Sequence, residues 1–179
     1  MTQIGTVYGQ ALYSLAREED LDRSILSQLT VLDSSFSQEP DFLRLLGAPN
    51  LGKEERCQIV DESFRNAVHP YVLNFLKLLT EKGYMRHFSA CVAAYREQYN
   101  EDNGILPVQA VTAVALSAEQ AEKLSSKLKQ ITGKTIELTN RVDPGCIGGV
   151  RLDYDGKRVD DTVSHRLDRI RSLLQNTVL

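Results

Sequence analysis

Residues 143–161, DPGCIGGVRLDYDGKRVDD, form a glycine-rich stretch in which phosphate chemistry is a first candidate. A phosphate-binding loop needs a strand, then glycines, then a helix whose backbone N–H groups face the anion, usually with a lysine. Here Gly148 and Gly149 precede a predicted strand, and no Lys-Ser or Lys-Thr pair follows them. The order of elements therefore favours a backbone role for both glycines, either conformational freedom or close packing where a loop enters a hairpin.

Metal ligands and nucleophiles are few and scattered. His87 and Cys91 lie four residues apart, which is metal-ligand spacing on a helix, but Cys91 also belongs to an apolar stripe and two ligands do not complete a site. His69 and His165 stand near expected helix starts, where surface histidines are common. Cys146 has no basic neighbour in the sequence, and no Gly-x-Ser-x-Gly is present. We expect no catalytic residue, no metal and no cofactor, with a small enzyme as the alternative.

Composition narrows the class of protein. The chain has 179 residues, 42% of them hydrophobic, and a formal net charge of −3, which disfavours nucleic acid as a partner. Three cysteines without Cys-x-x-Cys spacing indicate neither a disulfide framework nor a zinc ribbon, and they suit a reducing compartment. The apolar runs are too short to cross a bilayer, and the start lacks the pattern of a signal or transit peptide. We expect a folded chain, complete as printed, that meets a membrane only through partners.

The first part of the chain is predicted to form a six-helix bundle over residues 1–104, because apolar residues recur at intervals of three and four in each segment. The segments begin near residues 4, 21, 40, 53, 69 and 84. The helix beginning at residue 69 is apolar over most of its circumference. It is therefore either central to the bundle or covered by a partner, and both can hold.

After Gly104 the period changes from 3.6 to 2, which predicts a small mixed α/β domain over residues 105–179 and an α+β fold overall. A strand precedes the capping box Ser117-x-x-Gln120 and its helix, and a second strand follows at 134–142. Asp155-Gly156 predicts a hairpin turn, and a last helix closes the chain. On the strand, Val108, Ala110, Thr112 and Val114 alternate with Gln109, Val111, Ala113 and Ala115, and on the helix the expected buried face is Ala121, Leu124, Leu128 and Ile131.

Three stretches together resemble the delta subunit family of the F-type ATP synthase, which includes the mitochondrial oligomycin sensitivity-conferring protein. VYGQALYSLA is similar to the family's Tyr-Ala-x-Ala-Leu segment, with Gly9 in place of an alanine, and NFLKLLTEKG is similar to its fifth helix. The most specific stretch lies near the end, where DDT replaces the usual Asp-Gly-Ser. Its matching residues are Val142, Asp143, Pro144, Ile147, Gly148, Gly149, Asp160, Arg166 and Leu167.

The resemblance implies a stator component without catalysis of its own. The N-terminal bundle would bind N-terminal segments of alpha subunits in the catalytic head, with beta subunits as a further partner, while the C-terminal domain would hold the b subunits of the peripheral stalk. It also implies a peripheral position on the cytoplasmic face of a bacterial membrane, in a complex that couples proton-driven rotation to ATP synthesis. From the wide apolar faces of the first and fifth helices and from the geometry that the resemblance implies, we expect the alpha-binding groove to involve Tyr8, Ala11, Leu12, Leu15, Asn74 and Leu78.

Overall fold

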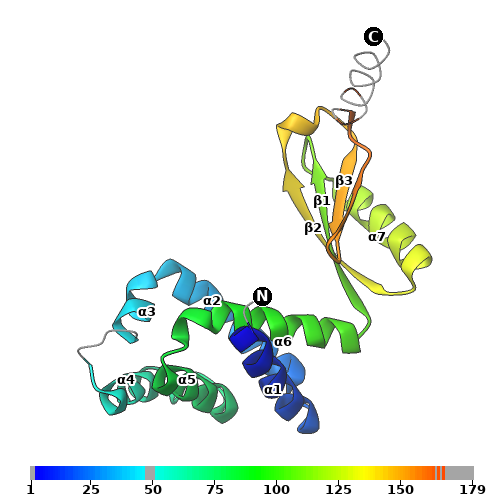
Figure 1. Cartoon of the computed structure of the whole chain (residues 1–179). Helices are drawn as coiled ribbons and strands as arrows, with labels where there is room; N and C mark the ends of the chain where they lie inside the picture. The colour runs from blue at the N-terminus through cyan, green and yellow to red at the C-terminus, as the bar shows by residue number, and fades with distance from the viewer. Residues whose placement is uncertain (1–2, 47–50, 164, 166, 168–179) are drawn as a thin grey trace, which may run out of the picture. The chain divides into compact units, whose positions relative to one another are not determined.

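The computed structural model describes residues 3–46, 51–163, 165 and 167, and it divides the chain into two compact units, Met1–Tyr99 and Asn100–Leu179 (Figure 1). The first unit is helical, and its predicted helices are all present. They are α1 (Gln3–Glu18), α2 (Asp22–Gln38), α3 (Pro40–Leu46), α4 (Lys53–Phe64), α5 (Pro70–Lys82) and α6 (Phe88–Asp102), the last preceded by the 3₁₀ turn η1 (Met85–His87).

Local signals in the sequence account for the bounds of α5. His69 is its N-cap, and the ring Nδ1 accepts a hydrogen bond from the backbone N–H of Tyr71 at 3.3 Å. Pro70 occupies the first helical position, where its missing N–H costs nothing. Gly83 ends the helix in the left-handed conformation, with φ of 71°, that favours glycine.

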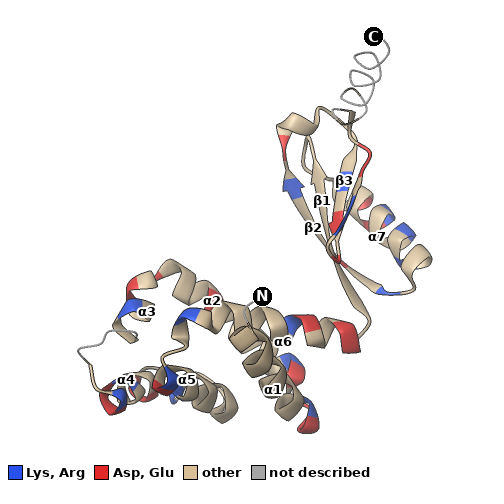
Figure 2. Cartoon of the chain, viewed as in Figure 1, with Lys and Arg blue, Asp and Glu red and all other residues tan. Residues whose placement is uncertain are grey.

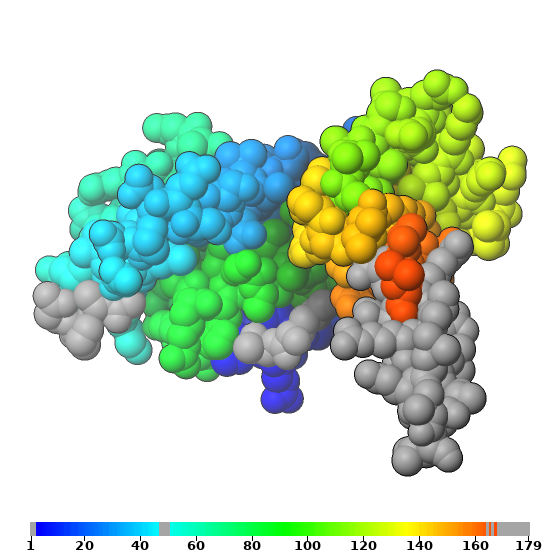
Figure 3. All heavy atoms as spheres, turned by 90° about the horizontal axis from the view of Figure 1, so that it is seen from above, coloured from blue at the N-terminus to red at the C-terminus, as the bar shows by residue number. Residues whose placement is uncertain are grey.

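The core of the bundle is a single cluster of buried side chains from all six helices. α2 and α6 lie side by side in the space-filling view (Figure 3), joined by the Tyr95 hydroxyl, which donates to the Asp22 carbonyl at 2.9 Å. α1 approaches α6 through two glycines. A Cβ on Gly9 would overlap the carbonyl oxygen of Cys91, and one on Gly5 would lie 2.6 Å from the Cβ of Ala90. Glycine at these positions therefore permits the close crossing of α1 and α6.

The second unit is a four-stranded sheet of order β2-β1-β3-β4 with one helix. Its elements are β1 (Ile105–Thr112), α7 (Ala118–Thr132), β2 (Thr135–Val142), the 3₁₀ turn η2 (Pro144–Cys146), β3 (Val150–Tyr154) and β4 (Lys157–Asp160). β1 runs parallel to β2 and antiparallel to β3. The predicted hairpin is confirmed, because Asp155-Gly156 forms the turn and sets Tyr154 opposite Lys157. The predicted capping box is also present, with Ser117 accepting from the N–H of Gln120.

The first predicted strand of this unit is too long, and the predicted buried face of its helix is wrong in part. Val114 lies beyond the strand and is exposed, because the chain turns after Thr112, whose hydroxyl donates to the Val114 carbonyl at 2.7 Å. None of the residues of α7 is buried, and Ile131 is 80% exposed. α7 lies chiefly against β2, an edge strand, so the sheet covers only part of the helix. Most of the predicted last helix lies outside the described residues.

Candidate docking surfaces

The first candidate surface is the outer side of α1. The buried side of this helix consists of Gly5, Gly9, Leu12, Tyr13 and Ala16. Opposite them, Val7, Ala11 and Leu15 recur every four residues and are exposed, with Val7 at 59%. α1 carries no charged residue before Arg17, as Figure 2 shows. An uncharged, partly apolar stripe on a helix whose other side is core is suited to bind another apolar surface.

α5 is a central helix of the bundle that still leaves a narrow open side. Its buried residues are Val72, Leu73, Phe75, Leu76, Leu79 and Thr80. Asn74 and Leu78, one helical turn apart, are exposed. Most of the apolar circumference of α5 is therefore explained by its central position in the bundle, and both groove residues predicted on α5 are exposed.

Tyr8 brings α1 to the end of α5. It is half-buried, and its ring meets that of Tyr84 edge-to-face, with centroids 5.9 Å apart. Leu12 instead lies in the core with 5% of its surface exposed, so it supports the surface from beneath. Sequence reasoning missed Val7, although its spacing of four residues from Ala11 was a sufficient signal.

In the second unit, the glycine pair packs against the chain that enters the final helical segment. Gly149 has φ of 82°, and a Cβ there would lie 2.5 Å from the carbonyl oxygen of Asp161. A Cβ on Gly148 would lie 3.5 Å from Val163, whose backbone N–H donates to the Gly148 carbonyl at 2.9 Å. The positive φ and the close contact at Gly149 both favour glycine at this position. The glycine pair contacts residues 161–163 of this chain.

The loop before the glycines is held by local hydrogen bonds. The Asp143 carboxylate caps η2 by accepting from the N–H of Gly145 at 3.0 Å, and Pro144 begins that turn. Ile147 follows with φ of 62° and is 65% exposed. A β-branched residue in the left-handed region is strained, so the loop holds an apolar side chain outward at some conformational cost.

Asp160 organises the start of the final segment. Its carboxylate accepts from both the backbone N–H and the hydroxyl of Thr162, at 3.0 and 2.7 Å, and these bonds lower the pKa of Asp160. The Thr162 hydroxyl in turn accepts from the N–H of His165 at 3.3 Å, as a helix N-cap does. Leu167 is exposed, and Arg166 lies outside the described residues. Of the predicted stalk residues, Gly148, Gly149 and Asp160 therefore contact the start of this segment.

Two carboxylates are held ionised by basic partners. Asp61 on α4 pairs with Lys77 on α5 and with Arg65, and the hydrogen bond from Lys77 is the main cause of its lowered pKa. Asp153 accepts a hydrogen bond from Arg158 across the hairpin at 2.7 Å, and this bond is the main cause of its lowered pKa. Both pairs join neighbouring elements of one unit.

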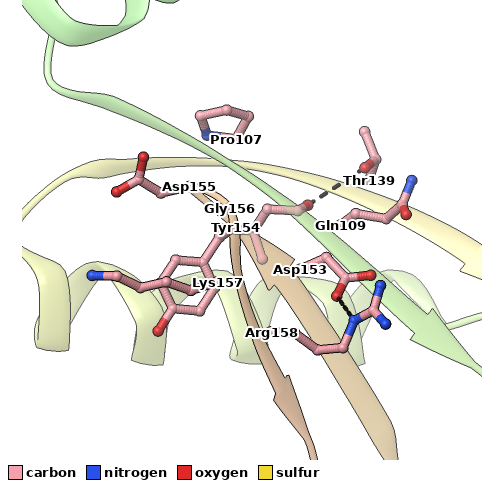
Figure 4. Close-up of a pocket in the computed structure, with 10 residues that line it drawn as sticks. Pro107, Gln109, Thr139, Asp153, Tyr154, Asp155, Gly156, Lys157 and Arg158 are labelled. Atoms are coloured by element: carbon pink, nitrogen blue, oxygen red, sulfur yellow. Dashed lines mark hydrogen bonds and ion pairs between the residues drawn. The ribbon is translucent and has the colours of Figure 1, made fainter.

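A hollow of about 580 Å³ lies between the hairpin and strands β1 and β2 (Figure 4). Gln109, Thr139 and Tyr154 line it together with the Asp153–Arg158 pair. Lys157 also lines the hollow, but no helix begins there, and its arginine is already paired with a carboxylate. The hollow thus has neither the N–H cradle of a phosphate loop nor a nucleophile beside a base.

The other chemical candidates have structural explanations. Cys91 is buried in the core, and burial raises its pKa to about 11, so it is neither a thiolate nucleophile nor a partner for His87 in an exposed metal site. Among the described residues, no group of three or more His, Cys, Asp or Glu could hold a metal ion. No helix in the described part of the chain is long and apolar enough to cross a membrane.

Comparison with known proteins identifies the family. The profile of the ATP synthase delta (OSCP) subunit matches residues 4–174. ATP synthase subunit delta of Lacticaseibacillus casei is 32% identical over 168 residues, covering 93% of this chain and 92% of that protein. The subunit delta of Alkaliphilus oremlandii is 31% identical and covers 96% of both chains. A chain of the Toxoplasma gondii mitochondrial ATP synthase hexamer has the same fold, with a TM-score of 0.76 at 17% identity over 97% of this chain.

The class of protein that the two-unit fold and these comparisons define is a subunit of an ATP synthase. The chain belongs to the ATP synthase delta (OSCP) subunit family of the F-type ATP synthase.

Proposed function

We propose that this chain is a stator component that links the catalytic head of the synthase to its peripheral stalk and has no catalysis of its own. The first unit binds N-terminal segments of alpha subunits, with beta subunits nearby, and the second binds the b subunits. The observation that carries the proposal is the exposed stripe Val7, Ala11 and Leu15 on a helix fixed to the core, in a member of this family. Through these partners the chain would lie at the cytoplasmic face of a bacterial membrane.

The form of the surfaces suits this role. A stator must stay bound to its partners under torque, so it needs contacts that dissociate slowly. Broad, non-catalytic surfaces provide such contacts. An amphipathic helix from the head would place its apolar residues against Ala11, Leu15 and Leu78, with Asn74 at the rim. When both units are engaged, each raises the effective concentration of the other contact.

Ala11→Asp tests the head-binding surface. Ala11 is exposed, so a carboxylate there leaves the bundle folded while placing a charge within an apolar contact. We expect the affinity for an alpha-subunit N-terminal peptide to fall by at least about tenfold, or 1.4 kcal/mol, by calorimetry. Ala118→Asp is the matched control, because it makes the same substitution at an exposed position of α7 in the second unit and should leave this affinity unchanged. Undiminished binding by a folded Ala11→Asp chain would refute the surface.

A shortened chain tests whether the first unit binds the head and the second unit binds the stalk. The core of the first unit lies within residues 12–95. A chain ending at residue 104 should therefore fold, retain head binding and lose capture of the b subunit in a pull-down. Capture of b by this shortened chain would contradict the assignment of the stalk to the second unit. With the full chain, co-purification of alpha, beta and b subunits distinguishes this function from that of a helix-binding adaptor outside the synthase.

A further inference from the structure

The outer edge of β2 is an eight-residue stretch of edge backbone, twice as long as β4 at the opposite edge. β2 pairs with β1 in an unbroken parallel register from Thr135 to Val142. Its sequence, TIELTNRV, contains none of the prolines or lysines that often block an edge. Such an edge is a template for a further strand.

The hydrogen bonds to β1 determine which residues of β2 face outward. The N–H of Thr135 donates to the Gly104 carbonyl, and that of Asp143 donates to the Thr112 carbonyl, both at 2.8 Å. Because the direction of backbone groups alternates along a strand, the odd-numbered residues face β1. The N–H and C=O groups that face outward are therefore those of Ile136, Leu138, Asn140 and Val142.

We propose that this edge pairs with β2 of a second copy of this chain, antiparallel and centred on Thr139. In this register Ile136 bonds Val142 of the second copy, and Leu138 bonds Asn140, so every outward-facing group meets another. Glu137 then faces Arg141 of the second copy at a position without backbone bonds, where side chains approach most closely. The two-fold axis repeats each pair, giving two contacts between opposite charges.

The charges distinguish this register from its neighbours. Pairing centred on Leu138 would set Glu137 opposite Thr139 and leave Arg141 opposite Thr135. Pairing centred on Asn140 would set Glu137 opposite Asp143, which places like charges together. Of these three registers, only the one centred on Thr139 places residues of opposite charge on the two β2 strands opposite each other. α7, which lies against β2 and leaves Ile131 exposed, adds uncovered apolar surface to this side of the unit.

The pairing is expected to be weak. An eight-residue edge is smaller than a standard interface of roughly 1,600 Å². We therefore expect a dissociation constant of about 10–100 μM for the full chain, corresponding to reversible dimers. The pairing concerns the free chain and involves none of the α1 residues proposed to bind the head.

Charge exchange tests the pairing. In sedimentation equilibrium of the full chain from about 5 μM to 1 mM, the wild type should show a monomer–dimer equilibrium. Glu137→Arg or Arg141→Glu places like charges in both contacts and should weaken it at least about tenfold. The double variant, with both substitutions, reverses each pair and should restore the dimer to within about threefold. Circular dichroism would verify that each variant is folded.

Glu97→Arg is the matched control, since it makes the same change of charge at an exposed position of α6 and should leave dimerisation unchanged. A chain that stays monomeric throughout the range would overturn the pairing. So would a dimer that is indifferent to either single substitution or not restored by the double variant. None of these outcomes would affect binding of an alpha-subunit peptide, which tests the proposed function separately.

Discussion

The two units of this chain are stabilised in different ways. In the bundle, the core cluster draws on all six helices and includes large side chains such as Tyr95, Phe88 and Leu76 with almost no exposed surface. In the second unit, α7 and β2 have no buried residue, and several apolar side chains, Ile131 and Ile147 among them, face solvent. Burial of apolar area thus stabilises the bundle much more than the sheet unit.

The second unit depends correspondingly more on its backbone. Its order comes from the strand ladder, from turns at Asp155-Gly156 and Pro144–Cys146, and from polar contacts such as Asn140, whose amide donates to Ala110 and Thr112. The bundle should therefore be most sensitive to loss of side-chain volume, and the second unit to added volume beside its backbone. The following substitutions test this difference.

The largest effect is expected for Tyr95→Ala in the bundle. Tyr95 is fully buried, contacts Tyr13 edge-to-face and donates to the Asp22 carbonyl. Removing the ring should lower the free energy of unfolding of the first unit by about 3–5 kcal/mol, measured by urea denaturation. Tyr95→Phe retains the ring and should lose only about 1 kcal/mol. A cost below about 1 kcal/mol for Tyr95→Ala would refute a volume-dependent core.

Gly149→Val should have the next largest effect, confined to the second unit. The new Cβ would lie 2.5 Å from the Asp161 carbonyl oxygen, at φ of 82°. Steric overlap and backbone strain together should cost about 2–4 kcal/mol, seen as faster hydrogen exchange in β3 and β4 but not in the bundle. Because the final segment shifts, capture of the b subunit should also fall.

Gly156→Ala separates the two causes. Gly156 also has positive φ, at 67°, but nothing lies within 4 Å of its Cβ position. Gly156→Ala should lower the free energy of unfolding of the second unit by only about 1 kcal/mol, because it adds backbone strain without steric overlap. Equal costs at Gly149 and Gly156 would mean that the approach of Asp161 is unimportant.

The same difference explains how much of the fold the sequence predicted. Helical periodicity and caps predicted the bundle well, because each of its helices buries one side in a common core. In the second unit, periodicity predicted the elements but extended the first strand to Val114 and misjudged burial at Ile131, since the small sheet does not cover every apolar residue. Whether an apolar residue is covered depends on tertiary packing, which periodicity does not contain.

Among the candidate site residues, the sequence predicted side-chain types better than surroundings. The order of elements indicated that Gly148 and Gly149 act through the backbone, but not that Gly149 approaches Asp161 and Gly148 approaches Val163. Leu12 shares the apolar spacing of Ala11 and Leu15, yet lies in the core. Separating these three required knowing where α6 lies, because the Gly5 and Gly9 contacts with α6 determine which side of α1 faces inward.

His69→Ala should have a smaller effect in the bundle, because it removes a cap and little packing. The N–H of Tyr71 loses its acceptor, whereas the bond from the backbone N–H of His69 to the Gln28 side chain, at 2.7 Å, remains. We expect a loss of about 1 kcal/mol in urea denaturation and faster exchange in the first turn of α5. His69→Ser should recover most of the loss, and a Ser variant as unstable as the Ala variant would argue against capping.

Acid should weaken both units through different carboxylates, with the smallest effect of this series. Asp61 and Asp153 have pKa values lowered from 3.8 by Lys77 and Arg158 respectively. A lowered pKa in the folded state means that the stabilisation is fully present above the unfolded value, about pH 4, and is lost as pH falls through the folded value. Urea denaturation followed by NMR at several pH values would resolve each unit.

Each carboxylate should govern only its own unit. Asp61→Asn should flatten the acid dependence of the bundle below about pH 4 and leave that of the sheet unit unchanged, while Asp153→Asn should do the reverse. Lys77→Met should reduce the acid dependence of the bundle only in part, because Arg65 still pairs with Asp61. If either Asn variant changed both units equally, the two units would share their stabilisation, and the difference between a core-stabilised bundle and a backbone-stabilised sheet would not hold.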